Sequence, residues 1–348
     1  MLQAIFHAWE RKLASITTDR VVRPFEWGLD WLSATDRRVA SAPATLIADW
    51  VSDVMADTDA FYTPAPTTDY ALADGAEAGE QILTFPSALQ TPQPANNTVY
   101  GRLFHTRESP DRAHRGAVVV LPQWNSDAGG HVGLCRLLAM NGLTALRLSL
   151  PYHDRRMPPE LRRADYIVSS NIVRTLQVCR QAVLDARRAI AWLHAQDYDR
   201  IGILGSSLGS CLSLLTTAHE PLVRAQALNH ISPYFADVVW RGISTAHVRE
   251  GLDGHIELDL LRELWQPLSP ANFIDRVRDR KTLLVYARYD LTFPVDLSRN
   301  LVCQFERQGI PHEVAVLRCG HYTTGVTPFK FIDGWILSRF LRRALFEN

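Results

Sequence analysis

The sequence predicts an α/β fold in which a mostly parallel central sheet carries helices on both faces. Short apolar runs of strand length alternate with amphipathic helical patterns from about residue 80 onward, and parallel strands need such helical connections. The run GAVVVLP at 116–122 is continuously apolar, as is typical of a strand that is covered on both faces. Together these observations predict a layered sheet with helices on either side.

The first part of the chain, 1–78, is predicted to be a helical extension. Four apolar residues follow one another at steps of three and four, as in an amphipathic helix: Phe6, Trp9, Leu13 and Ile16. We expect this face to pack against the main domain, and peripheral contact with a membrane surface is the alternative. The turn-rich segment 63–80 is predicted to be a loop or linker.

The main domain is predicted to span 79–348. Its expected strands are 82–85, 98–105, 116–122, 143–150, 200–205, 225–231, 282–287 and 313–317. The expected helices cover 132–141, 172–193, 207–219 and 294–308, and a final helix has Thr327 as its N-cap and Pro328 as its first residue. The segment 233–275 interrupts the alternation, and we interpret it as a small helical cap inserted over the sheet edge.

Composition excludes several classes of partner. The 348 residues include 37 basic and 37 acidic side chains, a balance that argues against nucleic acid or an anionic membrane as the main partner. Five cysteines are scattered without the spacing of a metal site, which fits a reducing compartment. No apolar stretch approaches the roughly 20 residues of a membrane span. We therefore expect a cytoplasmic protein with no transmembrane segment.

The most informative motif is the pentapeptide Gly205-Ser206-Ser207-Leu208-Gly209, which lies between a predicted strand and a predicted helix. A serine at so sharp a turn must adopt a strained backbone, and small residues on both sides let the strand and helix approach. Only Ser207 has a glycine two positions before and after it. The turn would expose its hydroxyl; a turn of small residues without a catalytic role is the alternative.

A candidate acid and a candidate base follow later in the chain, each after a predicted strand. Asp290 comes directly after the strand at 282–287, and His321 comes after the last strand. These residues and Ser207 would all lie at the carboxyl ends of parallel strands, where open α/β sheets build their sites. Two other acids, Asp296 and Asp237, could take the place of Asp290. We favour Asp290, because Asp296 falls within a helical turn where an acid is stabilised by the helix dipole.

These motifs resemble those of the α/β-hydrolase superfamily over roughly residues 80–345. The resemblance implies that Ser207 is the nucleophile, that Asp290 is the acid of the D-x-x-[VF]-P pattern, and that His321 is the base. Such proteins use a Ser-His-Asp triad and an acyl-enzyme intermediate, for which no metal or organic cofactor is required.

The resemblance also implies an oxyanion hole formed by two backbone N–H groups. One belongs to Leu208, and the other to the loop after the strand at 116–122. Where many members read His-Gly-x, this chain reads Pro122-Gln123-Trp124. The second donor is therefore Gln123 or Trp124, and position favours Trp124.

A narrower resemblance involves PYHDRRMP at 151–158 together with the surroundings of Asp290 and His321. This pattern is similar to the eighteenth α/β-hydrolase-domain family of vertebrate nomenclature, and it implies deacylation of lipids or acyl esters. His153 could belong to a second site, but a role in stabilising its loop is the interpretation we favour. His230 is interpreted as a hydrogen-bonded core histidine.

The sequence therefore predicts a serine hydrolase that acts on a small-molecule carboxylic ester. An acyltransferase with the same triad and a non-catalytic ligand-binding protein are the alternatives. Aromatic residues of the cap are expected to line an acyl pocket, although they could equally form a local core: Tyr234, Phe235 and Trp240.

Overall fold

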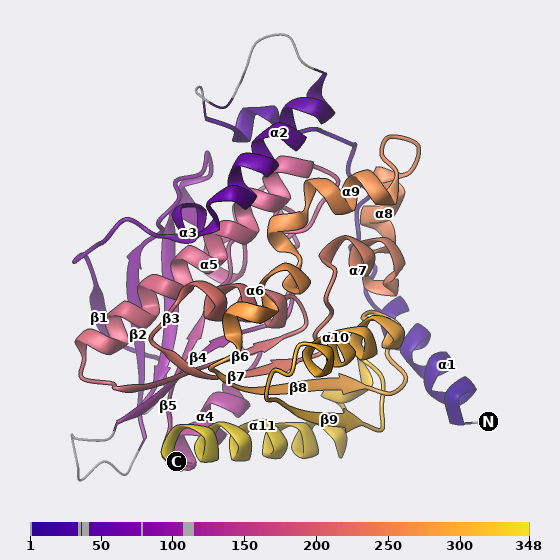
Figure 1. Cartoon of the computed structure of the whole chain (residues 1–348). Coiled ribbons are helices and arrows are strands. Elements are labelled where there is room, and N and C mark those ends of the chain that lie inside the picture. Colours follow the sequence, from indigo (N-terminus) through magenta and orange to yellow (C-terminus); the bar gives the residue numbers. More distant parts are fainter. Residues whose placement is uncertain (1, 34–35, 37–41, 78, 107–114, 348) are drawn as a thin grey trace.

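The computed structural model describes residues 2–33, 36, 42–77, 79–106 and 115–347. Within this part of the chain, nine strands form one sheet in the order β1-β2-β3-β5-β4-β6-β7-β8-β9 (Figure 1). The strands from β1 to β5 along this order pair antiparallel, and those from β5 through β4 to β9 pair parallel. The prediction of a mostly parallel sheet is confirmed.

The strands match the predicted ones apart from one addition. They are β1 (Ala71–Asp74), β2 (Glu80–Pro86), β3 (Thr98–Phe104), β4 (Gly116–Leu121), β5 (Thr144–Leu148), β6 (Arg200–Ser206), β7 (Val223–Asn229), β8 (Lys281–Ala287) and β9 (Glu313–Leu317). The prediction that 63–80 is only a loop or linker was wrong, because β1 lies within it. All four residues of β1 are exposed, so this edge strand has no buried face to produce an alternating pattern.

Helices cover both faces of the sheet. One face carries α5 (Ile172–Ala195), α6 (Leu208–His219) and α10 (Val295–Arg307), and the other carries α4 (Val132–Met140) and α11 (Phe329–Phe346). Successive valines of β4 alternate between the two hydrophobic clusters beneath these helices. α11 begins one residue later than predicted, with Pro328 as its N-cap, an offset within the ordinary uncertainty of helix ends.

A group of short helices connects β7 to β8, in the segment expected to form a cap. It contains α7 (Phe235–Arg241), α8 (Ala246–Leu252) and α9 (Leu258–Leu264), with 3₁₀ turns between and after them. In Figure 1 these helices stand above the carboxyl ends of the parallel strands. They therefore lie on the side of the sheet where the predicted site residues are expected.

The N-terminal helices pack on this framework. They are α1 (Leu2–Ser15), α2 (Pro43–Ala56) and α3 (Thr58–Tyr62). Phe6 stacks on Tyr289 with a centroid distance of 4.7 Å, whereas Ile16 lies beyond the end of α1 and is 67% exposed. Leu46 and Ile47 of α2 belong to the same hydrophobic cluster as α5 and α6. None of the helices in the described residues combines the length and apolar character needed to cross a membrane.

Candidate active site

The turn between β6 and α6 has the geometry that its glycines require. Ser207 has φ of 56° and ψ of −120°, a conformation that costs a non-glycine residue free energy. A Cβ atom on Gly209 would lie 2.1 Å from the carbonyl oxygen of Leu121, and one on Gly205 would lie 2.0 Å from the carbonyl oxygen of Gly209. Both glycines are therefore required by the close approach of α6 to the sheet.

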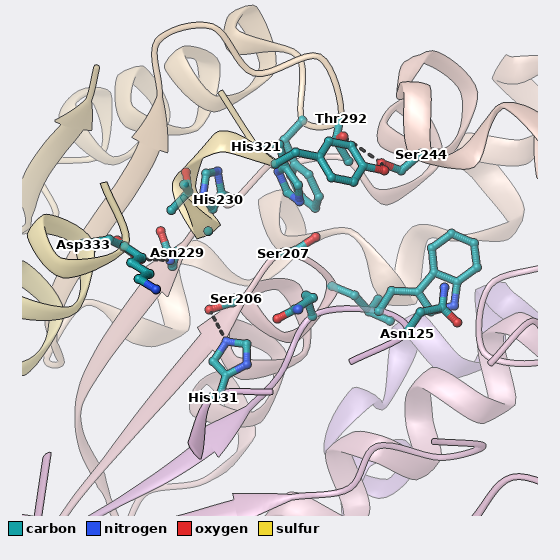
Figure 2. Close-up of a pocket in the computed structure, with 18 of the residues that line it drawn as sticks. Asn125, His131, Ser206, Ser207, Asn229, His230, Ser244, Thr292, His321 and Asp333 are labelled. Carbon is teal, nitrogen blue, oxygen red and sulfur yellow. Dashed lines mark hydrogen bonds between the residues drawn. The ribbon is translucent and has the colours of Figure 1, made fainter. Parts of the chain in front are cut away.

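This turn opens into a cavity of about 940 Å³. Ser207 and His321 both line the cavity, and the Ser207 hydroxyl points from the turn towards the side that carries His321 (Figure 2). Within the described residues Ser207 Oγ makes no hydrogen bond, while the Ser207 N–H donates to the carbonyl oxygen of Asn229 at 2.8 Å. The backbone of Ser207 is thus held while its hydroxyl is left free.

The predicted acid and base are in contact. His321 Nδ1 donates a hydrogen bond to Asp290 Oδ2 at 3.0 Å. The other carboxylate oxygen accepts from the backbone N–H groups of Thr292, at 2.8 Å, and Phe293, at 2.7 Å. The His321 ring stacks on Phe293 with an interplanar angle of 2°. His321 Nε2, which has no hydrogen-bond partner among the described residues, remains available to a group in the cavity.

His230 is a second histidine on the same carboxylate. Its Nδ1 also donates to Asp290 Oδ2 at 3.0 Å, and its ring centroid lies 4.5 Å from that of His321. Burial would raise the pKa of Asp290, but the charge of His321 and the hydrogen bonds from both imidazoles hold that pKa below its ordinary value. The sequence interpretation of His230 as a hydrogen-bonded core residue missed this contact, although its place after β7 fits the rule that located the other residues.

His230, Asp290 and His321 also form a group that could hold a metal ion, since their potential ligand atoms lie within 4.8 Å of one another. Both Nδ1 atoms, however, lie at hydrogen-bonding distance from one carboxylate oxygen. A proton on each Nδ1 accounts for both distances, whereas a metal ion would need the nitrogen lone pairs. We therefore interpret the group as a hydrogen-bonded cluster.

The loop after β4 lies beside Ser207. Gln123 and Trp124 both line the cavity, and neither backbone N–H has an acceptor within the part of the chain that is described. The next N–H, that of Asn125, donates to His153 Nε2 at 2.9 Å, and His153 Nδ1 donates to the carbonyl oxygen of Pro151 at 2.9 Å. Burial lowers the pKa of His153 to about 4, so this ring is neutral and supports the loop.

One of the three aromatic residues expected in an acyl pocket lines the cavity. Phe235 does so, together with other apolar residues of α6 and α7: Cys211, Val238 and Val239. Tyr234 and Trp240 are not among the lining residues, and this correction follows from the helical period. Phe235, Val238 and Val239 lie on one face of α7, whereas the Tyr234 hydroxyl accepts from Gln304 and the Trp240 ring lies under Arg249.

The two alternative acids lie in other environments. Asp296 forms an exposed ion pair with Arg241, whereas Asp237 is buried and pairs with Arg262. Neither makes a hydrogen bond to a histidine in the described residues. Of the three acids weighed in the sequence, Asp290 alone contacts His321.

Buried polar groups form the other side of the cavity. Asp333, from α11, accepts a hydrogen bond from Asn229 Nδ2 at 2.8 Å. Burial raises the pKa of Asp333 to about 6, against the opposing influence of the nearby His230. His131 Nε2 and Ser206 Oγ are joined by a hydrogen bond of 2.9 Å (Figure 2). No sequence pattern indicated these groups, because their burial depends on tertiary packing.

No family model and no curated protein matches this sequence. Solved structures do match it at low sequence identity. An acylaminoacyl peptidase from Pyrococcus horikoshii superposes with a TM-score of 0.62 at 14% identity, over 80% of this chain and 42% of the other. This chain thus spans about two fifths of the peptidase.

Two acetyl xylan esterases match over more of their length. One, from a Paenibacillus species, has a TM-score of 0.59 at 14% identity, and the other, from a Thermoanaerobacterium species, has 0.57 at 13%. Each match covers 95% of this chain and 98% of the esterase. These similarities establish the α/β-hydrolase fold.

The steric requirement for glycine at position 209 can be tested directly. Gly209→Ala should destabilise the protein by several kcal/mol, about the cost of severe overpacking, because the new methyl group would collide with backbone that cannot move independently. Chemical denaturation would measure the change. Gly133→Ala is the control, because a Cβ atom there meets nothing within 4 Å. Equal stability of the two variants would contradict the steric requirement.

The raised pKa of Asp333 predicts a dependence of stability on pH. Its folded pKa of about 6 exceeds the ordinary value of 3.8, so the folded state binds more protons than the unfolded state between these values. The free energy of unfolding therefore falls as pH rises through this window. Asp333→Asn removes the ionisable carboxyl group and therefore this loss of stability at higher pH. Denaturation should show the variant more stable than the parent at about pH 7.5, by on the order of 2 kcal/mol, with a smaller difference near about pH 4.5. A difference independent of pH would contradict the assignment.

Proposed function

We propose that this protein is a serine hydrolase that cleaves a carboxylic ester through Ser207, His321 and Asp290. The observation that carries the proposal is the 3.0 Å hydrogen bond from His321 to Asp290 beside a cavity into which Ser207 opens. A strained serine, an imidazole with a free Nε2 and a buried carboxylate are the components of nucleophilic acyl transfer.

The reaction follows from these positions. His321 Nε2 accepts the proton of Ser207 Oγ while that oxygen attacks the ester carbonyl, and Asp290 stabilises the resulting imidazolium. Collapse of the tetrahedral intermediate expels the alcohol, which takes the proton from His321. Water then attacks the acyl-enzyme, with His321 as its base, and releases the acid and free Ser207.

Two backbone N–H groups would hold the negative oxygen of the intermediate. Leu208 is the first residue of α6, so its N–H has no partner within the helix and receives the favourable dipole of the helix N-terminus. The second N–H comes from Gln123 or Trp124. Removal of one such donor typically costs about 3–4 kcal/mol of transition-state stabilisation.

The lining of the cavity supports an acyl ester as the substrate. Apolar side chains from α6 and α7 line the same cavity as Ser207, among them Cys211, Phe235 and Val238. The names of several structural neighbours describe ester-cleaving enzymes, and the narrower sequence resemblance implies deacylation of lipids or acyl esters. The partner is therefore proposed to be a small-molecule acyl ester.

Matched variants test the triad. Ser207→Ala and Asp290→Asn should each lower kcat/KM for an activated aryl ester about 1,000-fold or more, because the first removes the nucleophile and the second removes the charge that stabilises the imidazolium. Ser52→Ala, on an exposed face of α2, and Asp296→Asn should retain activity. A fluorophosphonate probe should modify Ser207, as located by peptide mass spectrometry.

Two results would contradict the proposal. They are full turnover by Ser207→Ala and loss of activity on treatment with EDTA, since the second would assign the His230–Asp290–His321 group to a metal ion. Addition of alcohol acceptors to the same assay would distinguish hydrolysis from acyl transfer, which the triad also permits.

The cavity next to Ser207 should select acyl chains by length. Val238→Phe adds volume at a lining position and should lower kcat/KM for octanoyl esters about tenfold or more, while acetyl esters change little. A panel of aryl esters that differ only in chain length would measure this selectivity. A parallel loss for both esters would place the acyl chain elsewhere.

A further inference from the structure

The loop that carries His321 is bound by a carboxylate from the opposite end of the chain. Glu10 of α1 is completely buried. One of its oxygens accepts from the backbone N–H of Tyr322 at 2.9 Å, and the other accepts from the N–H and the hydroxyl of Thr323 at 2.9 and 2.8 Å. These donors directly follow His321 in the chain.

No direct ion pair balances this buried carboxylate. Within the described residues, no Lys, Arg or His lies at ion-pair distance from Glu10. A buried charge strongly destabilises the folded state unless hydrogen bonds replace its hydration, and the donors that do so here belong to the loop. A displaced loop would leave the charge unsatisfied, so the burial of Glu10 favours one loop position strongly.

The residue before His321 is a glycine, Gly320, and the contact with Glu10 leaves no room for a side chain there. A Cβ atom on Gly320 would lie 2.3 Å from the carboxyl carbon of Glu10. The Gly320 N–H donates to Thr323 Oγ1 at 2.7 Å, and that hydroxyl donates to Glu10. The chain therefore turns around the carboxylate, with His321 inside the turn.

The same helix also contacts the loop that carries the acid. Phe6, one helical turn before Glu10, stacks on Tyr289, and the Tyr289 N–H donates to the carbonyl oxygen of Cys319 at 2.9 Å. Figure 1 shows α1 alongside the carboxyl ends of β8 and β9, from which both loops emerge. α1 thus supports the acid and base loops together.

We propose that Glu10 is a positioning residue that fixes His321 for proton transfer from Ser207. The inference depends on the proposed function for its kinetic consequence. A displacement of about 1 Å at a reacting group can lower the rate about 100-fold, and Glu10 does not line the cavity. Its loss should therefore lower kcat while KM stays nearly constant.

Three variants of α1 test this role kinetically. Glu10→Ala should lower kcat about 100-fold with KM changed by less than about twofold. Glu10→Gln should lower kcat about tenfold, because one amide oxygen still accepts from Thr323 whereas the amide NH₂ faces the Tyr322 N–H. Arg11→Ala, at an exposed position of the same helix, should match the parent. Unchanged kcat in Glu10→Ala would overturn the proposal.

Proton NMR gives a readout that does not require activity. The Nδ1 protons of His321 and His230, both bonded to Asp290, should give low-field resonances, which His321→Gln and His230→Gln assign. Glu10→Ala should broaden or shift the His321 signal more than the His230 signal, and Gly320→Ala should do the same by displacing the carboxylate. An unchanged His321 signal would overturn the positioning role. Failure of the proposed function would instead appear as turnover that survives Ser207→Ala.

Discussion

The close approach of α6 to the sheet is the constraint on which the candidate site depends. Gly209 lies against the carbonyl oxygen of Leu121, and Gly205 lies against Gly209 itself. Because no side chain fits at either position, the chain between them must turn sharply, and Ser207 takes a positive φ. The same contact places the start of α6 beside the loop that follows β4. The packing of α6 against β4 therefore positions the candidate nucleophile together with the candidate oxyanion donors.

Asp290 is the second residue on which the candidate site depends, because hydrogen bonds from several segments of the chain meet at its buried carboxylate. Its four donors come from three segments: its own loop, the loop after β7 and the loop after β9. Each bond replaces part of the hydration that the carboxylate lost on burial. The backbone donors fix one oxygen and the two imidazoles share the other. The Asp290 carboxylate therefore interacts with two imidazoles, those of His230 and His321, and not with His321 alone.

The sequence predicted those features of the fold and the candidate site that depend on local residue patterns. Strand and helix periodicities located nearly all elements of the main domain. The G-x-S-x-G spacing and the strand-end positions of His321 and Asp290 identified a serine and a histidine that line one cavity, and the acid that contacts the histidine. The edge strand β1 was missed because it buries no side chains. Tyr234 and Trp240 were assigned to the cavity on aromatic character alone, whereas the orientation of α7 decides which residues face it. The contact of His230 with Asp290 and the role of Glu10 were missed because both involve residues remote in sequence.

Glu10 shows why such contacts escape sequence reasoning. In the sequence it is a charged residue between Trp9 and Leu13, and charged side chains of a surface helix usually lie on its solvated face. In the structure it is the most deeply buried residue of α1. His321 thus lies between two buried carboxylates with different roles: Asp290 binds the ring, and Glu10 binds the backbone that follows it. Because Glu10 contacts main-chain N–H groups, it can restrict where the imidazole lies without competing for the Nδ1 proton. The N-terminal helix is therefore best understood as part of the candidate site.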